Sequence, residues 1–305
     1  MKAFYCDHFV LPLPEGHKFP MAKYSRLRER VVGDGLIAAA DLFEAQPASW
    51  ADLALVHTAA YLEDVERGTL SRDTQRRIGF PWSPQMVQRA RRSVGATIQA
   101  ARAALREGAA ANLAGGTHHA FAERGEGFCV FNDVAVASRV LMREALARRI
   151  VVIDCDVHQG NGTASIFAND AAVFTFSMHG AHNFPFHKET SDLDVTLEDG
   201  ADDDEYHARL AEHVPRVLDR HDPDVAFYVS GADPYEGDRF GRLKLTIEGL
   251  RRRDAFVFAE CRSRSIPVIV TMAGGYAPDI DAVVTIHANT IREAALSLRQ
   301  PVHVE

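Results

Sequence analysis

The stretch VVIDCDVHQGNG, residues 151–162, begins like a buried strand and ends in two acids and an imidazole. Its first three residues are β-branched, and the short apolar run 150–154 is typical of a strand that is buried on both faces of a parallel sheet. Asp154, Asp156 and His158 follow at every second position. Because ligands of open parallel sheets bind beyond the carboxyl ends of the strands, this stretch indicates both a fold class and the place of a functional site.

Short apolar runs and longer segments of helical period alternate along the rest of the chain. This order predicts an α/β fold with a mostly parallel multi-stranded sheet and helices on both faces. The clearest predicted strands are residues 150–154, 172–177, 224–230 and 267–272, with weaker candidates at 3–6 and 53–56. The predicted helices are residues 83–107, 133–148, 204–220 and 246–264. The segment 180–205 is the most irregular, and its acidic second half is predicted to be a solvated surface loop.

The composition is that of an ordinary globular chain, since 47% of its 305 residues are apolar and 25% are charged. No repeat, low-complexity tract or Pro/Gly-rich linker divides it, so a single domain over residues 1–305 is expected. The net charge of −8 does not indicate the basic surface that binds a nucleic-acid backbone, and we expect no direct DNA or RNA binding. No signal peptide is recognised, and no apolar stretch reaches the roughly 18 residues of a membrane span, so a cytoplasmic protein without membrane contact is expected.

Polar residues follow each of the four clear strands, at the edge where the carboxyl ends of parallel strands meet. Asp156 and His158 follow the first strand and Asp233 follows the third, and one imidazole with two carboxylates makes a divalent-metal site with an open position for water. Taken alone, the D-x-D-x-H pattern also fits Mg²⁺ in phosphoryl-transfer enzymes, or an Asp that only caps a helix. A structural zinc site would need four ligands, usually thiolates, and the cysteines lack C-x-x-C spacing: Cys6, Cys129, Cys155 and Cys261. The pattern therefore favours a catalytic site.

Two further motifs supply groups that could move protons or stabilise charge beside such a site. The loop GGTHHAF holds His118 and His119, and the segment AGGY ends in Tyr276. A divalent ion lowers the pKa of bound water, and a neighbouring imidazole can take its remaining proton and later deliver one to a leaving amine. A tyrosine hydroxyl can stabilise a developing oxyanion. The alternatives are a histidine pair that only satisfies the core and a tyrosine that only packs in a turn.

The motifs GGTHHAF, GFCVFND, DCDVHQGNG, SGADP and AGGY, in this order, resemble the histone deacetylase family of zinc amidohydrolases. The resemblance spans nearly the whole chain, and the segments HKFPMAKYSRL and GEGFCVFND are most similar to the class IV branch and its bacterial relatives. It implies the arginase–deacetylase fold, an α/β sheet with the active site at the carboxyl ends of its strands. It also implies that Asp156, His158 and Asp233 are zinc ligands and that His118 and His119 handle protons.

The same resemblance implies that Tyr276 stabilises the transition state. It implies that Asp154 hydrogen-bonds to the first histidine and helps to hold a structural K⁺ with main-chain oxygens near Ser177 and Met178. Two departures from the family pattern affect this neighbourhood. Asn161 stands where many members have an Asp that pairs with the second histidine, and Ala273 replaces a glycine often found before the tyrosine, which would stiffen that loop.

A narrow channel for an acyl-lysine side chain is also implied, with Gly127, Phe128 and Phe184 as its walls. Four methylenes favour an apolar tube with the metal at its floor. An aromatic residue that follows a glycine beside a polar site is expected to serve this tube and to have little role in packing. The resemblance thus implies a zinc-dependent hydrolase that removes acetyl or longer acyl groups from the ε-amine of lysine in proteins or peptides.

Several alternatives remain open at this point. Acetylpolyamines or another small amide could be the substrate, and an acidic gatekeeper over the channel would favour them. A binuclear arginase-like ureohydrolase would need further metal ligands where Gly160 and Tyr235 stand, and an acyl-lysine-binding pseudoenzyme would usually have lost a ligand or the tyrosine. Fe²⁺ could replace Zn²⁺ in an N/O₂ site. The sequence does not determine the acyl length or the oligomeric state.

Overall fold

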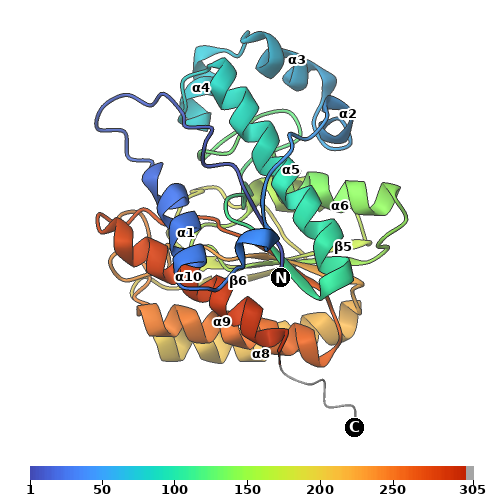
Figure 1. Ribbon diagram of the computed structural model, residues 1–305, viewed down its shortest axis with the longest axis vertical. Helices are drawn as coiled ribbons and strands as arrows, with labels where there is room; N and C mark the ends of the chain where they lie inside the picture. Colours follow the sequence, from blue (N-terminus) through green and yellow to red (C-terminus); the bar gives the residue numbers. More distant parts are fainter. Residues whose placement is uncertain (300–305) are drawn as a thin grey trace.

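Eight parallel strands form one sheet in the computed structural model, which describes residues 1–299 (Figure 1). The strands are β1 (Ala3–Tyr5), β2 (Leu42–Glu44), β3 (Ala109–Asn112), β4 (Ile150–Asp154), β5 (Val173–Gly180), β6 (Leu193–Leu197), β7 (Val225–Val229) and β8 (Val268–Thr271). Their order across the sheet is β2-β1-β3-β8-β7-β4-β5-β6, and all neighbouring pairs are parallel. The predicted parallel α/β architecture is confirmed.

Helices cover both faces of this sheet. They are α1 (Ala22–Gly33), the 3-10 turn η1 (Ala39–Asp41), α2 (Trp50–Leu53), α3 (Ala59–Arg67), α4 (Arg72–Ile78), α5 (Pro84–Glu107), α6 (Asp133–Arg143), α7 (Asn161–Phe167), α8 (Asp203–His221), α9 (Ile247–Ser263) and α10 (Ile280–Ser297). In Figure 1, α5 and α6 lie above the sheet, and α8, α9 and α10 lie below it. In the described part of the chain, no helix combines the length and apolarity that a bilayer span requires.

Strand β4 shows how the two layers fix the site. Ile150 and Val152 pack into the core on the α5 and α6 face, whereas Val151 and Ile153 pack into the core on the α8 to α10 face. Each of these side chains is at most 1% exposed, and its burial contributes about 1.5–3 kcal/mol. A strand buried in this way on both faces has room for charged groups only at its end, where its last residue, Asp154, begins the polar segment.

The long helix α5 begins as the sequence predicts. The Ser83 side chain accepts a hydrogen bond from the backbone N–H of Met86, and Pro84 occupies the first turn, where its missing N–H costs nothing. Gly108, at a φ of 86°, ends the helix. The chain then turns directly into β3, a strand that the sequence analysis did not predict.

Two predicted elements are wrong. The candidate strand 53–56 is instead the end of α2 and the turn after it, because Ser49 and Asp52 form a capping box that starts a helix there. The helix predicted for 133–148 ends at Arg143, since Ala145 takes a positive φ of 55° that an α-helix does not allow.

The acidic half of the segment 180–205 is also less open than predicted. It contains β6, which pairs with β5 along the edge of the sheet. Asp192 accepts hydrogen bonds from the backbone N–H and hydroxyl of Thr175, at 2.8 and 2.9 Å. Asp194 accepts one from the side chain of Gln159, at 2.8 Å. These two acids therefore hold the edge strand in place instead of only facing water.

Candidate metal centre and active site

The carboxyl ends of five neighbouring strands meet around one group of polar side chains. The side chains follow β3 (His118 and His119), β8 (Tyr276), β7 (Asp233) and β4 (Asp156 and His158), or end strands β4 and β5 (Asp154 and Ser177). Most of them are almost fully buried, so they act on each other in a low-dielectric environment. His118 and Tyr276 are 158 positions apart in the sequence, yet they line the same pocket.

Asp156, His158 and Asp233 form a compact, buried cluster. Nδ1 of His158 lies 2.9 Å from Oδ1 of Asp156 and 3.2 Å from Oδ2 of Asp233. One ligand atom from each residue lies within 4.8 Å of the others, and within residues 1–299 this is the one cluster of this kind. Oδ2 of Asp233 has no hydrogen-bond partner there, which is costly for a buried carboxylate oxygen. One nitrogen and two oxygen donors fit a divalent ion such as Zn²⁺ or Fe²⁺.

Backbone groups hold the two carboxylates in place. The N–H of Val157 donates to Oδ1 of Asp233 at 3.0 Å, and the N–H of Gly274 donates to Oδ2 of Asp156 at 2.8 Å. A Cβ atom on Gly274 would lie 1.7 Å from Oδ2 of Asp233 and 2.7 Å from Oδ2 of Asp156. Only glycine fits at this position, because any side chain would occupy the space between the two acids.

The electrostatics of the cluster favour a bound cation. Burial lowers the pKa of His158, but the carboxylates of Asp156 and Asp233 raise it by more, to about 10. Burial and the neighbouring Asp156 carboxylate raise the pKa of Asp233 to about 6. Two buried carboxylates repel each other, and a positive charge between them relieves this repulsion.

The two histidines differ in the partner of their Nδ1 atom. Nδ1 of His118 lies 2.6 Å from Oδ2 of Asp154, whereas Nδ1 of His119 lies 2.7 Å from the amide oxygen of Asn161. Burial lowers the pKa of His118, but Asp154 raises it by more, to about 9. Burial and the charge of His118 lower the pKa of His119 well below its ordinary value. Asp154 therefore favours the protonated form of His118, whereas the surroundings of His119 favour its neutral form and leave Nε2 as a proton acceptor.

Tyr276 is positioned through its backbone and its ring. Its N–H donates to Oδ2 of Asp238 at 2.6 Å, and its ring centroid lies 5.8 Å from that of Phe128 and 5.1 Å from that of Phe240. The buried Lys23 ammonium donates to the main-chain oxygens of the three preceding residues, at 3.1, 3.3 and 3.4 Å: Ala273, Gly274 and Gly275. The loop is therefore held through backbone atoms and the Tyr276 ring, and the Tyr276 hydroxyl takes no part in these contacts.

Ala273, one of the two departures from the family pattern, links two parts of the site. A Cβ atom on Gly116 would lie 2.6 Å from the Cβ atom of Ala273. The methyl group of Ala273 therefore packs directly against the glycine loop that precedes His118. This close approach accounts for a glycine at position 116 and ties the tyrosine loop to the histidine loop.

The three predicted channel residues lie in the lining of one open pocket. Gly127, Phe128 and Phe184 face it, and His119 and His158 contribute to the same lining. The Phe184 ring centroid lies 5.0 Å from that of His119, so this wall reaches the polar groups directly. The structure thus brings the predicted channel residues and the candidate site together.

Gly127 and Phe128 are held by the end of helix α4. Their N–H groups donate to the main-chain oxygens of Arg77 and Ile78, at 2.9 and 2.8 Å. Both residues have positive φ angles, 55° for Gly127 and 66° for Phe128. A Cβ atom on Gly127 would lie 2.6 Å from Cδ2 of His119, so glycine is required for space as well as for conformation.

The expectation that Phe128 has little role in packing is wrong. Its ring centroid lies 5.9, 5.2 and 5.4 Å from those of His17, Phe19 and Phe80. The ring also fills the space that a side chain on Gly79 would need. Phe128 is therefore both a wall of the pocket and a member of an aromatic cluster.

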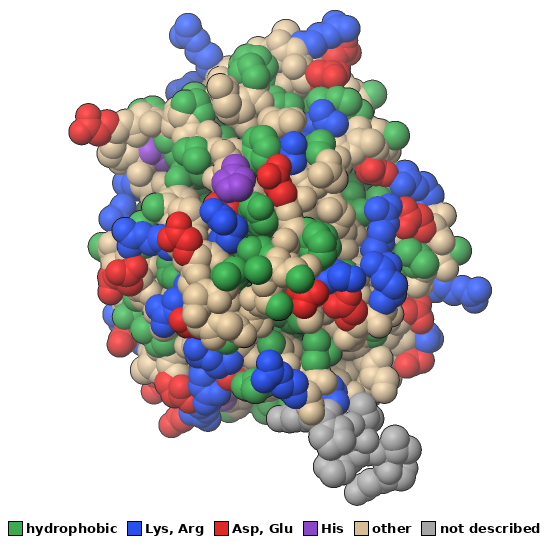
Figure 2. Space-filling model, in the orientation of Figure 1, with side chains coloured by type: hydrophobic (Ala, Val, Ile, Leu, Met, Phe, Trp, Pro, Cys, Tyr) green, Lys and Arg blue, Asp and Glu red, His purple; other side chains and the backbone are tan. Residues whose placement is uncertain are grey.

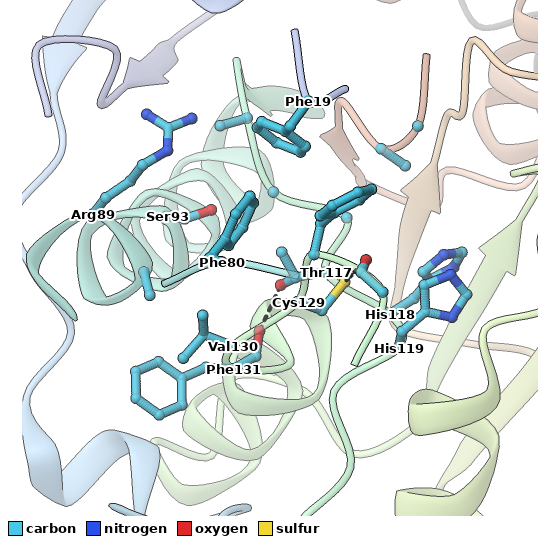
Figure 3. Close-up of a pocket in the computed structure, with 18 of the residues that line it drawn as sticks. Phe19, Phe80, Arg89, Ser93, Thr117, His118, His119, Cys129, Val130 and Phe131 are labelled. Atoms are coloured by element: carbon cyan, nitrogen blue, oxygen red, sulfur yellow. Dashed lines mark hydrogen bonds between the residues drawn. The ribbon is translucent and has the colours of Figure 1, made fainter. Parts of the chain in front are cut away.

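A second cavity continues inward past the histidines (Figure 3). Apolar side chains make up much of its lining: Leu11, Phe19, Phe80, Met86 and Val130. In Figure 3, His118 and His119 lie at one end and Arg89 lies at the other. The guanidinium of Arg89 donates to the main-chain oxygens of Cys6 and Phe9, both at 3.3 Å. The cavity gives a small apolar group room beyond the reaction centre.

The predicted monovalent-cation residues lie side by side on neighbouring strands. Asp154 of β4 is in register with Ser177 of β5, and both side chains and that of Met178 are buried. The Ser177 hydroxyl lies 2.9 Å from Nδ1 of His179. The K⁺ site itself stays a prediction.

Arg253 supports the site from below, and the sequence analysis did not single it out. Its side chain is fully buried and pairs with Asp254, with Nη2 2.8 Å from the carboxylate. Nη1 donates to the main-chain oxygens of Cys155 and Gly231, at 3.1 and 2.7 Å. Cys155 immediately precedes Asp156, and Gly231 lies two residues before Asp233, so one guanidinium ties both carboxylate-bearing loops together.

Asp133 has a similar supporting role beneath the histidine loop. Its Oδ2 accepts a hydrogen bond from the N–H of Gly116 at 3.1 Å, and its Oδ1 accepts from the N–H and hydroxyl of Thr117, at 2.8 and 2.7 Å. Asp133 is the last letter of the motif GFCVFND, so the sequence contained this residue without revealing its contacts.

Comparison with known proteins adds to this geometry. Residues 17–291 match the family model of the histone deacetylase domain. An uncharacterized protein from a Picosynechococcus strain is 46% identical over 290 residues, which cover 95% of this chain and 97% of that protein. Histone deacetylase 2 of Arabidopsis thaliana is 31% identical over 277 residues, 85% of this chain and 70% of that protein.

Two solved structures show the same fold at low sequence identity. The HD domain of HDA15 superposes with a TM-score of 0.82 at 20% identity, over 98% of this chain and 91% of that one. The acetylpolyamine aminohydrolase of Burkholderia pseudomallei superposes with a TM-score of 0.80 at 20% identity, over 96% of this chain and 98% of that one. These likenesses concern the arrangement of the sheet and helices.

Proposed function

The chain belongs to the histone deacetylase family, and from this membership we propose that it is a metal-dependent hydrolase that removes acyl groups from the ε-amine of lysine in proteins or peptides. The observation that carries the proposal is the apolar channel of Gly127, Phe128 and Phe184, which ends at His119 and His158. Burying three or four methylenes of a lysine stem there would contribute about 2–3 kcal/mol, at roughly 0.8 kcal/mol each.

The metal in this proposal is Zn²⁺, with Fe²⁺ as a possible replacement, held by Asp156, His158 and Asp233. A divalent ion supplies a Lewis acid that polarises the amide carbonyl and lowers the pKa of water. The chain itself contributes the orientation of the ligands, because Gly274 and Arg253 fix the loops that carry them.

The remaining roles fall to residues around the ligands. His119 accepts a proton from the attacking water at Nε2, because Asn161 occupies its Nδ1, and then donates it to the departing lysine amine. His118 stays protonated because its Nδ1 is paired with Asp154. Its positive charge stabilises negative charge that develops beside His118 during the reaction. The Tyr276 hydroxyl donates to the carbonyl oxygen as it becomes an oxyanion. The inner cavity receives the acyl group.

Acetylpolyamine hydrolysis is the alternative substrate class. A cationic polyamine chain would be favoured by an acidic group over the channel. Among the described residues that line the outer pocket, the one acid is Glu126, and arginines outnumber it. The lining therefore supports an acyl-lysine peptide over a polyamine.

A panel of substrates tests the proposal directly. The purified protein is assayed with acetyl-lysine peptides, with longer acyl-lysine peptides and with acetylpolyamines. We expect the peptides to have the higher kcat/KM. Faster turnover of acetylpolyamines would contradict the lysine assignment, and no amide hydrolysis by the metal-loaded protein would contradict the proposed activity altogether.

The channel makes a further prediction. Phe128→Ala removes one wall and is expected to lower kcat/KM for acyl-lysine peptides by roughly 10-fold or more, a loss of about 1.4 kcal/mol of transition-state stabilisation. Gly127→Leu should block the channel, since its side chain would meet His119 and its φ is positive. Steady-state kinetics measures both effects.

Metal analysis of both variants is the control, because neither residue contacts the ligand cluster. Phe128→Leu is the matched variant, since it keeps an apolar side chain in the aromatic cluster and should retain more activity than Phe128→Ala. If Phe128→Ala and Gly127→Leu both hydrolysed peptides like the unchanged protein, the lysine stem would have to lie elsewhere.

A further inference from the structure

The outer end of the channel, called the mouth below, carries more basic than acidic side chains. The charged residues in its lining are Arg76, Arg77, Arg242 and Glu126. Lys18 stands at its rim, with Nζ 5.7 Å from the ring centroid of the lining residue Phe240. The whole chain has a net charge of −8, and basic and acidic side chains are interspersed on the face drawn in Figure 2. The lining of the mouth therefore has three arginines and one glutamate, although the chain as a whole is acidic.

Two acids at or beside the mouth, Glu126 and Asp238, are engaged by other groups. The Glu126 side chain is only 18% exposed, and its Oε2 lies 3.7 Å from Nε of Arg124. The Asp238 carboxylate accepts hydrogen bonds from three backbone N–H groups, at 2.6, 2.8 and 3.0 Å: those of Tyr276, Phe240 and Gly241. These contacts reduce the ability of either carboxylate to offset the arginines.

The basic side chains, in contrast, are available to a ligand. Arg77 is exposed and makes no ion pair with any residue in the described range 1–299. Arg76 pairs with Asp73, and Arg242 lies 3.0 Å from Asp199. These two pairs are exposed to water, and such pairs are weak, so a carboxylate of a bound molecule can compete for the guanidinium groups.

The basic groups also come from separate parts of the chain. Arg76 and Arg77 belong to helix α4, Arg242 follows β7, and Lys18 lies in the segment before α1. They thus surround the entrance through which a side chain must pass to reach His119. A peptide that inserts one side chain there must place its neighbouring residues among these cations.

We propose that the mouth selects acyl-lysine peptides in which acidic residues flank the acyl-lysine. Guanidinium groups bind carboxylates through paired hydrogen bonds, and charges at the rim of a site raise the rate of encounter with an oppositely charged ligand. The inference rests on the proposed function and names its substrate class: anionic acyl-lysine peptides are taken, and cationic peptides and acetylpolyamines are repelled.

Three acetyl-lysine peptides of equal length test the inference, with flanking residues that are acidic, neutral or basic. The acidic peptide is expected to have a kcat/KM roughly fivefold or more above that of the basic one at low salt, chiefly through KM. The ratio should shrink between roughly 0.02 and 0.3 M salt, because salt screens exposed charges. Equal values for the three peptides, or a preference for the basic one, would overturn the inference.

Variants then locate the effect. Arg77→Glu should abolish or invert the preference for the acidic peptide, and Arg77→Lys should preserve most of it because the charge is kept. Arg106→Glu is the matched control. Arg106 is also exposed, but it lies just before β3, at the amino ends of the strands and away from the mouth. This variant should leave the ratio unchanged. An equal change in Arg106→Glu would show a non-specific effect of net charge and would overturn the role of the mouth.

The neutral peptide separates this inference from the proposed function. If it is hydrolysed while the acidic and basic peptides do not differ, the proposed activity stands and the selectivity at the mouth is wrong. If none of the three peptides is hydrolysed by the metal-loaded protein, the proposed function fails, and the inference fails with it.

Discussion

The substitution Asp233→Asn is expected to remove the divalent ion and to lower kcat/KM by roughly 10³-fold or more. A metal that acts as a Lewis acid contributes several kcal/mol to transition-state stabilisation, and each 1.36 kcal/mol is about tenfold in rate. Asn has nearly the shape of Asp but lacks the charge, and Oδ2 of Asp233 is a buried carboxylate oxygen without a hydrogen-bond partner among the described residues. Elemental analysis and kinetics of the purified variant measure the two effects.

Chelation of the unchanged protein provides the companion experiment. Exhaustive removal of the metal should abolish hydrolysis, and added Zn²⁺ or Fe²⁺ should restore it with one ion per chain. Two tightly bound ions would favour the arginase-like alternative, although Gly160 and Tyr235 offer no ligands for a second one. Full activity after exhaustive chelation would show that the cluster of Asp156, His158 and Asp233 has another role.

The second large effect concerns the residues that move charge without holding the metal. His119→Ala and Tyr276→Phe should each lower kcat by roughly 10²-fold or more, with metal content unchanged. Tyr276→Phe is informative because the loop is held by its backbone N–H and ring, which the variant keeps. The loss should therefore reflect the hydroxyl alone.

Tyr5→Phe is the matched control for that variant. Tyr5 ends strand β1, lies in the lining of neither pocket, and packs its ring against His8 and Arg28. Removing its hydroxyl should leave kcat unchanged. If His119→Ala or Tyr276→Phe lost the metal, the affected residue would be a ligand or a structural support, and its catalytic assignment would be wrong.

The sequence was sufficient for the parts of the fold that depend on strong local signals. The strands β4, β5, β7 and β8 are rich in β-branched and aromatic residues, and their burial on both faces makes the pattern unambiguous. Strand β3 was missed because its residues AAAN have low strand propensity and directly follow a long Ala-rich helix. Its place beside β8 and β1 comes from tertiary packing, since small residues allow α5 to approach the sheet closely.

The residues of the candidate site also fall into two groups, those that the sequence predicted and those that it did not. Residues directly after strands could be predicted together, because parallel strands bring their carboxyl ends to one edge. The supporting residues Lys23 and Arg253 could not, since each lies in a helix whose charged residues usually face water. Their roles depend on which way a long side chain turns, and both turn inward to main-chain oxygens of the active-site loops. The packing of Phe128 was missed for the same reason, as its partners are distant in sequence.

The attachment of Gly127 and Phe128 to the last carbonyl groups of helix α4 has an evolutionary consequence. The candidate catalytic residues lie in loops at the ends of the central strands. The channel wall, in contrast, is hydrogen-bonded to a short helix outside the sheet, and this helix also carries Arg76 and Arg77. Mutations that shift or recharge this helix would change the width of the channel and the charge at its entrance while leaving the carboxylates and imidazoles undisturbed. Descendants of this chain could therefore diverge in the peptides they accept without passing through an inactive ancestor.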